Sequence, residues 1–372
     1  MRVLIIPDKF KGTLSALKAA EAISRGWREI RPHDRLDLLP MSDGGDGFGE
    51  ILGELFTAER RTVQTVNAAH EPVRAEWWWS ASQRTAVVES ANIIGLAMLP
   101  PGKFHPFLLD TFGLGHLLRT IASEVSGSRV IIGIGGSATN DAGFGMARGL
   151  GFRFEDASGL CIEAWTELDR LVYVIPPVDS PRFEQITIAC DVQNPLLGPT
   201  GASRIYGPQK GLRPEDFSIA DRCFERLVEV VRRDLGIDCA DEPGTGAAGG
   251  LGFGLRAFLQ GSFKPGFDIF SEAAQLKDRV ASADLIVTAE GAIDQQTAMG
   301  KGTGAIAELA RQAGKPCIGL AGFLPSEKGL ELFRFVLGVA PMFATAEESK
   351  REPAKWLEHI AAEAARRVDK LG

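Results

Sequence analysis

Short apolar runs alternate with amphipathic stretches at the start of the chain. Residues 3–6 form an apolar run, which predicts a buried strand. Between residues 17 and 30, apolar side chains recur every three or four positions, which predicts a helix with Thr13 as its N-cap. Residues 36–39 predict a second strand and residues 48–56 a second helix. Strands that alternate with helices in this way are typical of a parallel α/β sheet.

The pattern changes after about residue 60. Residues 60–66 and 73–79 alternate like the two strands of a hairpin, which indicates a second domain with antiparallel character. The parallel pattern returns near the C-terminus, with strands expected at 284–288, 317–320 and 335–339 and helices at 303–313 and 354–370. We therefore expect the α/β class with two domains. Residues 1–62 and 283–372 form a discontinuous parallel-sheet domain, and residues 63–282 form an inserted mixed α/β domain.

The length of 372 residues suits two domains, and the charge count narrows the possible partners. Forty-eight acidic against 41 basic residues give a net charge of −7, with no basic cluster, so we expect no nucleic-acid partner. The chain has no run of about 18 uncharged apolar residues, so we expect no membrane partner. Five scattered cysteines without a C-x-x-C pair favour a cytoplasmic protein with reduced thiols.

Polar and glycine-rich segments follow several predicted strands. In open α/β sheets, ligands bind beyond the carboxyl ends of the strands, so these segments are candidate sites. Residues 8–13 combine Asp8 and Lys11 with a helix start, which suits an anion. In residues 43–47, Asp43 and a second carboxylate lie on a glycine-rich turn. They could bind Mg²⁺, although a plain turn has the same composition.

Residues 133–143 follow a predicted strand with an unusually polar loop. Their G-x-G-x-x-A spacing also fits a dinucleotide-binding turn, which is a weak motif by itself. Backbone amides and hydroxyl groups in this loop suit phosphate oxygens, and Asp141 suits a metal or a hydroxyl group. The candidate phosphate-binding residues here are Gly135, Gly136, Ser137, Thr139 and Asn140.

Three further segments carry candidate chemistry. Asp191 comes directly after an apolar strand, and Asn194, Arg204, Gln209 and Lys210 follow it as possible contacts for a small polar substrate. Residues 244–254 are so rich in glycine that we expect close approach by a backbone or a ligand. Glu290, Asp294 and Lys301 combine acids and a cation after a strand, but the spacing around Lys301 does not match a Walker A loop.

This set of residues favours phosphoryl transfer. The chain shows no Ser-His-Asp or Cys-His pattern and no pair of histidines with metal-ligand spacing. In phosphoryl transfer the protein positions the nucleotide, neutralises charge with Mg²⁺ and lysine, and offers a carboxylate to accept the hydroxyl proton. An NAD(P)-linked oxidoreductase that uses the turn at 133–138 is the alternative, and a non-catalytic small-molecule binding protein is a third possibility.

In these segments the chain resembles the bacterial type-1 glycerate kinase family. The matching segments are residues 7–16, 40–48, 87–96, 132–145, 190–211, 244–254 and 289–302. The resemblance implies an ATP- and Mg²⁺-dependent kinase that converts D-glycerate to 2-phosphoglycerate. It also implies two α/β domains, one of them Rossmann-like and discontinuous, with the active site in the cleft between them. The family usually has Ser, Glu, Thr, Gly and Pro where this chain has Lys9, Asp46, Phe48, Ala142 and Thr303.

From these residues and this resemblance we expect the following roles. Asp191 or Asp294 is the general base, and Lys11 is the third catalytic residue. The expected substrate-binding residues are Asp8, Asn194, Arg204, Gln209 and Lys210, with Arg204 as a clamp for the substrate carboxylate. The nucleotide is expected on Gly135, Gly136, Ser137, Thr139, Asn140 and Lys301, and the metal on Asp43, Asp141 and Glu290. The residues leave open the choice between 2- and 3-phosphorylation, the oligomeric state and the preference among related hydroxy acids.

Overall fold

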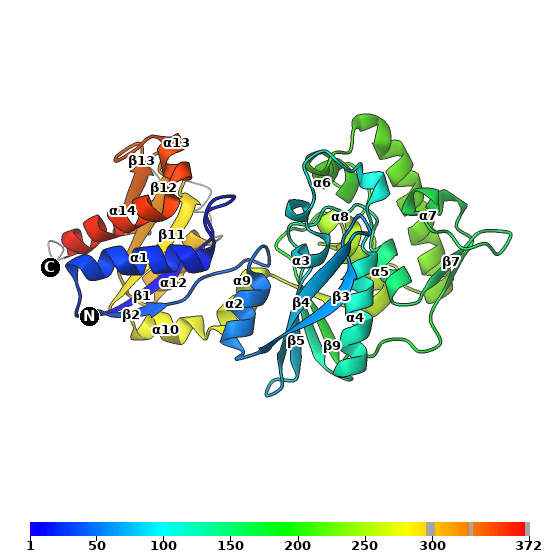
Figure 1. Ribbon diagram of the computed structural model, residues 1–372, viewed down its shortest axis with the longest axis horizontal. Helices are drawn as coiled ribbons and strands as arrows, with labels where there is room; N and C mark the ends of the chain where they lie inside the picture. The colour runs from blue at the N-terminus through cyan, green and yellow to red at the C-terminus, as the bar shows by residue number, and fades with distance from the viewer. Residues whose placement is uncertain (295–301, 327–329, 369–372) are drawn as a thin grey trace. The chain divides into compact units, whose positions relative to one another are not determined.

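The computed structural model describes residues 1–294, 302–326 and 330–368. Packing divides the chain into two units (Figure 1). Unit 1 comprises Met1–Ser42 and Phe270–Gly372, and unit 2 comprises Asp43–Ile269. Both units contain sheets covered by helices, so the predicted α/β class is confirmed.

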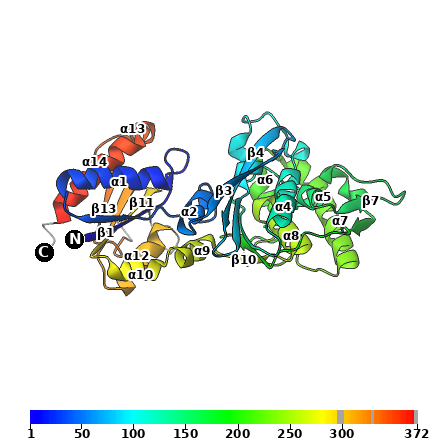
Figure 2. The same cartoon turned by 60° about the horizontal axis from the view of Figure 1, so that its bottom comes forward.

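Unit 1 is built on a five-stranded parallel sheet in the order β13-β12-β11-β1-β2. Helices α1 and α14 lie side by side on one face, and α10 and α12 lie on the other (Figure 2). Because both faces are covered, β1 is an almost continuous apolar run with buried side chains, as the sequence predicts. The elements are β1 (Arg2–Pro7), α1 (Ala16–Ile30), β2 (Arg35–Leu38), α10 (Leu276–Ser282), β11 (Leu285–Ala292), α12 (Thr303–Gln312), β12 (Cys317–Phe323), β13 (Phe335–Ala340), α13 (Ala346–Arg351) and α14 (Pro353–Val368).

Helix α1 begins two residues later than the N-cap that the sequence predicts. Its N-cap is Ser15, whose hydroxyl oxygen accepts a hydrogen bond from the backbone N–H of Lys18 at 3.3 Å. Thr13 instead donates its hydroxyl to the carbonyl oxygen of Phe10 at 3.0 Å. The predicted cap at Thr13 is therefore wrong, because its hydroxyl closes the turn that precedes the helix.

Unit 2 contains a six-stranded mixed sheet in the order β10-β9-β6-β5-β4-β3. The antiparallel hairpin that the sequence predicts is present as β3 and β4, and β5 also pairs antiparallel with β4. Strands β5, β6, β9 and β10 run parallel, so their carboxyl ends share one edge. The elements are α2 (Phe48–Leu55), β3 (Glu59–Val66), β4 (Pro72–Ser80), β5 (Thr85–Glu89), α3 (Ala91–Ile94), α4 (Phe112–Glu124), β6 (Arg129–Gly133), α5 (Phe144–Gly149), β7 (Arg153–Glu155), β8 (Tyr173–Ile175), β9 (Gln185–Ala189), α6 (Ala202–Lys210), α7 (Phe217–Leu235), α8 (Ala247–Leu259) and β10 (Ser262–Lys264). Helix α9 (Gly266–Ala273) spans the division between the units.

The division between the units differs from the boundaries drawn from the sequence at 62/63 and 282/283. Helix α2 belongs to unit 2 because it packs on β4 and β5. Gly49 and Gly53 of α2 lie so close to the Trp78 ring that a Cβ on either would overlap it. Helix α10 belongs to unit 1 because it packs on β1 and α12.

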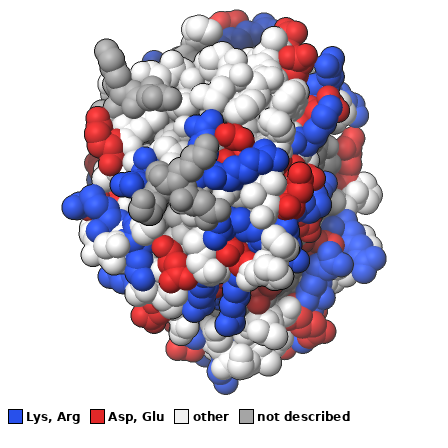
Figure 3. Space-filling view, turned by 90° about the vertical axis from the view of Figure 1, so that its left-hand side faces the viewer, with Lys and Arg blue, Asp and Glu red and all other residues white. Residues whose placement is uncertain are grey.

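The surface carries charges of both signs. On the face shown in Figure 3, basic and acidic side chains are interspersed. Within the described part of the chain, no helix combines the length and the apolar character that crossing a bilayer requires.

Candidate functional site

Unit 1 presents a polar crevice at the carboxyl ends of its central strands. In the sheet, β2 lies on one side of β1, and β11, β12 and β13 lie on the other. The strand order therefore reverses direction between β1 and β11. Ligands of open α/β sheets bind at such a switch point. Lys11 and Glu290 both line a pocket of about 490 Å³ here. Asp8 begins the same loop, is 8% exposed, and accepts a 2.7 Å hydrogen bond from the backbone N–H of Lys9.

The remaining candidates of unit 1 follow β11. Glu290 lies within this strand, and its carboxylate accepts a hydrogen bond of 2.8 Å from the hydroxyl of Thr303 at the start of α12. Asp294 comes two residues after the strand and is partly buried. Lys301 lies outside the described residues. The structure thus brings Lys11 and Glu290 to one pocket and places Asp8 and Asp294 at the same edge of the sheet.

Unit 2 presents a second edge, where the glycine-rich loops meet. The backbone N–H of Gly135 donates to the carbonyl oxygen of Gly44 at 3.3 Å. A Cβ on Gly135 would lie 2.9 Å from the Cα of Gly45, so this approach requires glycine. Asp43 itself is exposed, whereas the next residue, Gly44, is buried and lies against Ala189 at the end of β9. The turn at 43–47, predicted to bind a metal, and the loop at 133–143, predicted to bind phosphate and called the phosphate loop below, are therefore in direct contact.

A buried carboxylate binds the start of helix α2 at this edge of the sheet. Glu89, at the end of β5, is 4% exposed and accepts hydrogen bonds of 3.0 Å from the backbone N–H groups of Gly47 and Gly49. These groups belong to the start of α2, where the helix dipole favours a negative charge. Sequence analysis did not identify Glu89, although its position at a strand end before Ser90 is the same signal that marked Asp191.

Asp191 follows β9 at the same edge. It is partly buried, and its Oδ1 accepts a 3.1 Å hydrogen bond from the backbone N–H of Gly266, the first residue of α9. A carboxylate at a helix N-terminus is held in one orientation and favoured in its charged form. Asp191, Asp43 and the loop at 133–136 thus lie along one edge of unit 2.

The phosphate-loop side chains are more deeply buried than the sequence suggests. Ser137 is 5% exposed, and Thr139 and Asn140 are fully buried. The ammonium group of Lys210 donates to the Ser137 hydroxyl at 3.0 Å and to the Thr139 carbonyl oxygen at 2.7 Å. The amide of Asn140 donates to the Ser203 hydroxyl at 3.0 Å. Lys210 and Asn140 therefore tie this loop to α6.

The buried environment changes the acid–base behaviour of Lys210. Burial lowers the pKa of its ammonium group to about 7, although the carboxylate of Asp141 acts in the opposite direction. With this pKa, Lys210 exchanges between its charged and neutral forms near neutral pH.

Two polar atoms of the same loop lack a partner. Among the residues that the structure describes, the Thr139 Oγ1 and Asn140 Oδ1 atoms are buried without a hydrogen-bond partner.

The second glycine-rich segment packs against the phosphate loop. The backbone at Ala248, Gly249 and Gly250 is left-handed. A Cβ on Gly249 would overlap the carbonyl oxygen of Thr139, and a Cβ on Gly254 would lie 2.7 Å from the Cα of Gly143. Of the two explanations offered for residues 244–254, close approach of a backbone accounts for this packing.

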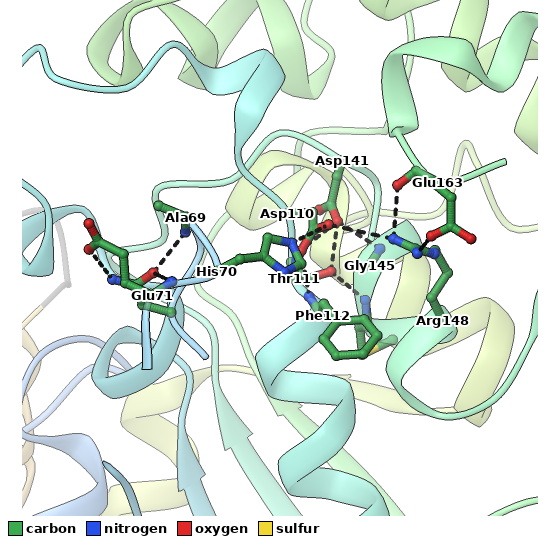
Figure 4. Close-up of polar contacts among 12 residues, drawn as sticks. Ala69, His70, Glu71, Asp110, Thr111, Phe112, Asp141, Gly145, Arg148 and Glu163 are labelled. Carbon is green, nitrogen blue, oxygen red and sulfur yellow. Dashed lines mark hydrogen bonds and ion pairs between the residues drawn. The ribbon is translucent and has the colours of Figure 1, made fainter. Parts of the chain in front are cut away.

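Asp141 is the centre of a buried network (Figure 4). Its Oδ2 accepts hydrogen bonds from the Thr111 hydroxyl at 2.8 Å and from the backbone N–H groups of Thr111 and Gly145 at 2.9 Å. Its Oδ1 accepts a weaker bond from the N–H of Gly143 at 3.3 Å. Burial raises the pKa of Asp141 to about 6, and the nearby Asp110 carboxylate adds to this rise. These donors occupy the oxygens that a metal would need, so Asp141 orients the loop.

The network reaches the surface through residues that sequence analysis did not identify. Nε2 of His70 and Oδ2 of Asp110 lie 2.9 Å apart, and this hydrogen bond raises the pKa of His70. The guanidinium of Arg148 lies 3.9 Å from the same carboxylate (Figure 4). The pair Asp110-Thr111 is visible in the sequence as a helix start, but nothing in the pattern links it to Asp141, thirty residues later.

The other expected substrate contacts have partners of their own. The amide of Asn194 donates to the carbonyl oxygen of Thr200 at 2.9 Å, and its Oδ1 accepts from the Tyr206 hydroxyl at 2.6 Å. Arg204 forms an ion pair of 2.7 Å with Asp221. Gln209 is exposed. Asn194 thus braces its own loop, and a clamp role for Arg204 requires its guanidinium to leave or share Asp221.

The described residues do not form a resident metal centre. Among them, no group of three or more His, Cys, Asp or Glu side chains could hold a metal ion. Asp43 and Glu290, two of the three expected ligands, belong to different units. Mg²⁺ needs only one or two carboxylates when substrate phosphates supply other ligands, so the donor set fits a magnesium ion that enters with a nucleotide.

The loop at 133–138 does not have the geometry of a dinucleotide-binding turn. Such a turn connects a strand directly to a helix whose N-terminus binds the pyrophosphate. Here β6 ends at Gly133 and α5 begins at Phe144, so residues 134–143 separate them. The geometry disfavours the oxidoreductase alternative.

Comparison with known proteins gives a consistent result over the whole chain. The model of the glycerate kinase family matches residues 3–369. A glycerate kinase from Bacillus subtilis is 38% identical over 98% of this chain and 97% of its own length. The glycerate 2-kinase of Escherichia coli is 38% identical over 89% of this chain and 87% of its own. A crystal structure from Salmonella typhimurium LT2, provisionally named glycerate kinase 2, is 34% identical, with a TM-score of 0.83, over 100% of this chain and 98% of that one.

Proposed function

This chain belongs to the glycerate kinase family and is a phosphotransferase, and from that premise we propose that it phosphorylates D-glycerate with Mg·ATP to give 2-phosphoglycerate. The observation that carries the proposal is the pairing of this family membership with acids at the carboxyl edges of both sheets and a lysine at that of unit 1. Lys11 and Glu290 provide them in unit 1, and Asp43 and Asp191 in unit 2. Five free thiols fit a reducing compartment, so we place the enzyme in the cytoplasm.

In phosphoryl transfer the protein positions the two substrates and neutralises charge on the transferred phosphoryl group. The C2 hydroxyl of glycerate attacks the γ-phosphorus, the bond to the β–γ bridging oxygen breaks, and ADP leaves. Asp191 accepts the hydroxyl proton, since its carboxylate is held at the N-terminus of α9; Asp294 is the alternative base. The ammonium of Lys11 stabilises the charge on the phosphoryl oxygens. A magnesium ion that arrives with the triphosphate would supply further charge neutralisation.

The buried groups of unit 2 prepare the site. Lys210 holds the loop at 135–140 through Ser137 and Thr139, and Asp141, which follows this loop, is fixed by Thr111 and Gly145. We assign both residues to positioning this loop, and Asp43 to the magnesium that arrives with the nucleotide. Arg204 remains the proposed clamp for the glycerate carboxylate and Gln209 a proposed substrate contact, whereas Asn194 braces its own loop.

A coupled assay of ADP release tests the proposal. Purified protein is mixed with Mg·ATP and, in separate reactions, with D-glycerate, L-glycerate or no acid. We expect ADP release that requires D-glycerate and stops when magnesium is chelated. Release at equal rates with and without the acid would contradict it, and so would a protein that binds glycerate without any turnover.

A further inference from the structure

The pocket at the switch point of unit 1 is complete within that unit. It is bounded by the loop after β1, the end of β11, the end of β12, and helix α13 with the start of α14. Its volume of about 490 Å³ lies in the range of roughly 300–1,000 Å³ found for small-molecule and cofactor sites. A three-carbon acid would fill only a small part of it.

The floor of this pocket is fixed by close backbone packing. A Cβ on Gly322 would lie 2.8 Å from the carbonyl oxygen of Gly291 and 3.4 Å from the Phe10 ring. The hydroxyl of Ser349 in α13 donates to the carbonyl oxygen of Gly322 at 3.0 Å. Helix α13 is therefore tied to the end of β12, and the pocket is formed before any ligand arrives.

Three ammonium groups line the pocket. Lys9 and Lys11 come from the loop after β1, and Lys350 comes from the last turn of α13. Glu290 is the acid among the lining residues, and its carboxylate accepts the hydroxyl of Thr303. A lining with three cations and one acid favours a ligand with several negative charges, and lysine is a common phosphate ligand.

Apolar side chains form another part of the wall. Phe323, at the end of β12, is 43% exposed, which is unusual for a large aromatic residue at the end of a buried strand. Ala292, Ala346 and Pro353 also line the pocket. An exposed aromatic face beside small apolar groups suits a flat heteroaromatic ring, which stacks on it in an offset or edge-to-face arrangement.

We infer that this pocket binds the nucleoside triphosphate, with the base against Phe323 and the phosphates among Lys9, Lys11 and Lys350. The inference rests on the proposed function and adds which unit holds the nucleotide. It replaces the expectation that Ser137, Thr139 and Asn140 bind it, because those side chains are buried within unit 2. The glycerate and the proposed base Asp191 then belong to unit 2.

Steady-state kinetics of Lys350→Ala test the lysine contact. Lys350 is exposed, so its loss leaves the fold intact, which a melting curve checks. We expect the KM for ATP to rise about tenfold, equivalent to about 1.4 kcal/mol, with the KM for glycerate unchanged. Lys350→Arg should restore most of the ATP affinity. The matched control Lys18→Ala removes an exposed lysine of α1 outside the pocket and should leave both KM values unchanged. An unchanged KM for ATP in Lys350→Ala would overturn the inference.

Photolabelling with 8-azido-ATP separates this inference from the proposed function. Labelling of peptides that contain Phe323 or residues 346–353, suppressed by excess ATP, supports the nucleotide site. If that labelling occurs in a protein that never phosphorylates glycerate, the nucleotide site stands and the proposed function fails. If the enzyme phosphorylates glycerate but only residues 135–140 are labelled, the proposed function stands and the inference is overturned.

Discussion

Two buried ionisable side chains in unit 2 have pKa values moved towards neutrality. Asp141 is fully buried with a pKa of about 6, and Lys210 is 7% exposed with a pKa of about 7. Burial is the main cause of both shifts because it disfavours the charged form of each group. The sequence showed both residues as polar members of polar segments, but each is buried against a segment that is distant along the chain, Asp141 against Thr111 and Lys210 against the loop at 137–139.

Lys210 makes the stability of the protein depend on pH. In the unfolded chain its ordinary pKa keeps the amine protonated, whereas in the folded protein it loses the proton above pH 7. Stability therefore rises with pH, and this contribution is lost as pH falls through 7, with a slope of up to about 1.4 kcal/mol per pH unit. The free energy of unfolding, measured with denaturant between pH 7 and about 8.5, should rise less steeply with pH in Lys210→Met than in wild type. The upper limit keeps the measurement below the ordinary pKa of cysteine. Lys18→Met should keep the wild-type slope, and identical slopes in all three proteins would contradict the assignment.

Asp191 carries the residue-scale prediction for catalysis. Asp191→Asn keeps an oxygen to accept the N–H of Gly266 but removes the proton acceptor. If Asp191 is the general base, kcat should fall about 10²–10³-fold, with little change in the melting temperature. Asp179→Asn, at an exposed position, is the matched control. A wild-type kcat in Asp191→Asn would move the role to Asp294, whose Asn variant should then show the loss.

At the scale of elements, the parallel strands were predictable and the irregular segments were not. Apolar runs such as residues 3–6 mark strands buried on both faces, and the alternation in β3 and β4 marks a half-exposed hairpin. The late start of α5 and the left-handed residues in α8 depend on which backbones meet in space, which no local pattern records. For the same reason, the candidate acids at strand ends were found, whereas Thr111 and Asp110 were missed.

The packing of residues 244–254 on the phosphate loop can be tested with two glycines of the same backbone conformation. Gly249 has φ +69° and no room for a Cβ beside Thr139, whereas Gly236 has φ +71° and nothing within 4 Å. Gly236→Ala should lower the free energy of unfolding by about 1–2 kcal/mol from the left-handed conformation alone. Gly249→Ala should lower it by at least about 2 kcal/mol more and reduce activity, because the loop must move. Equal losses in the two variants, measured by urea unfolding, would contradict this packing.

At the scale of the whole molecule, the chain forms unit 1 from both of its ends and unit 2 from its middle. The sequence indicated this arrangement because strand–helix alternation appears at both ends and a hairpin pattern lies between them. It could not place the boundaries, since α2 and α10 are assigned by what they pack on and not by their own composition.

The central claim is that this protein transfers a phosphoryl group to the C2 hydroxyl of D-glycerate. The most direct test is ³¹P NMR of purified protein incubated with Mg·ATP and D-glycerate. We predict a new phosphomonoester signal that matches 2-phosphoglycerate and grows in step with ADP. A signal of 3-phosphoglycerate would contradict the position of transfer, and the absence of any phosphorylated acid would contradict the claim itself.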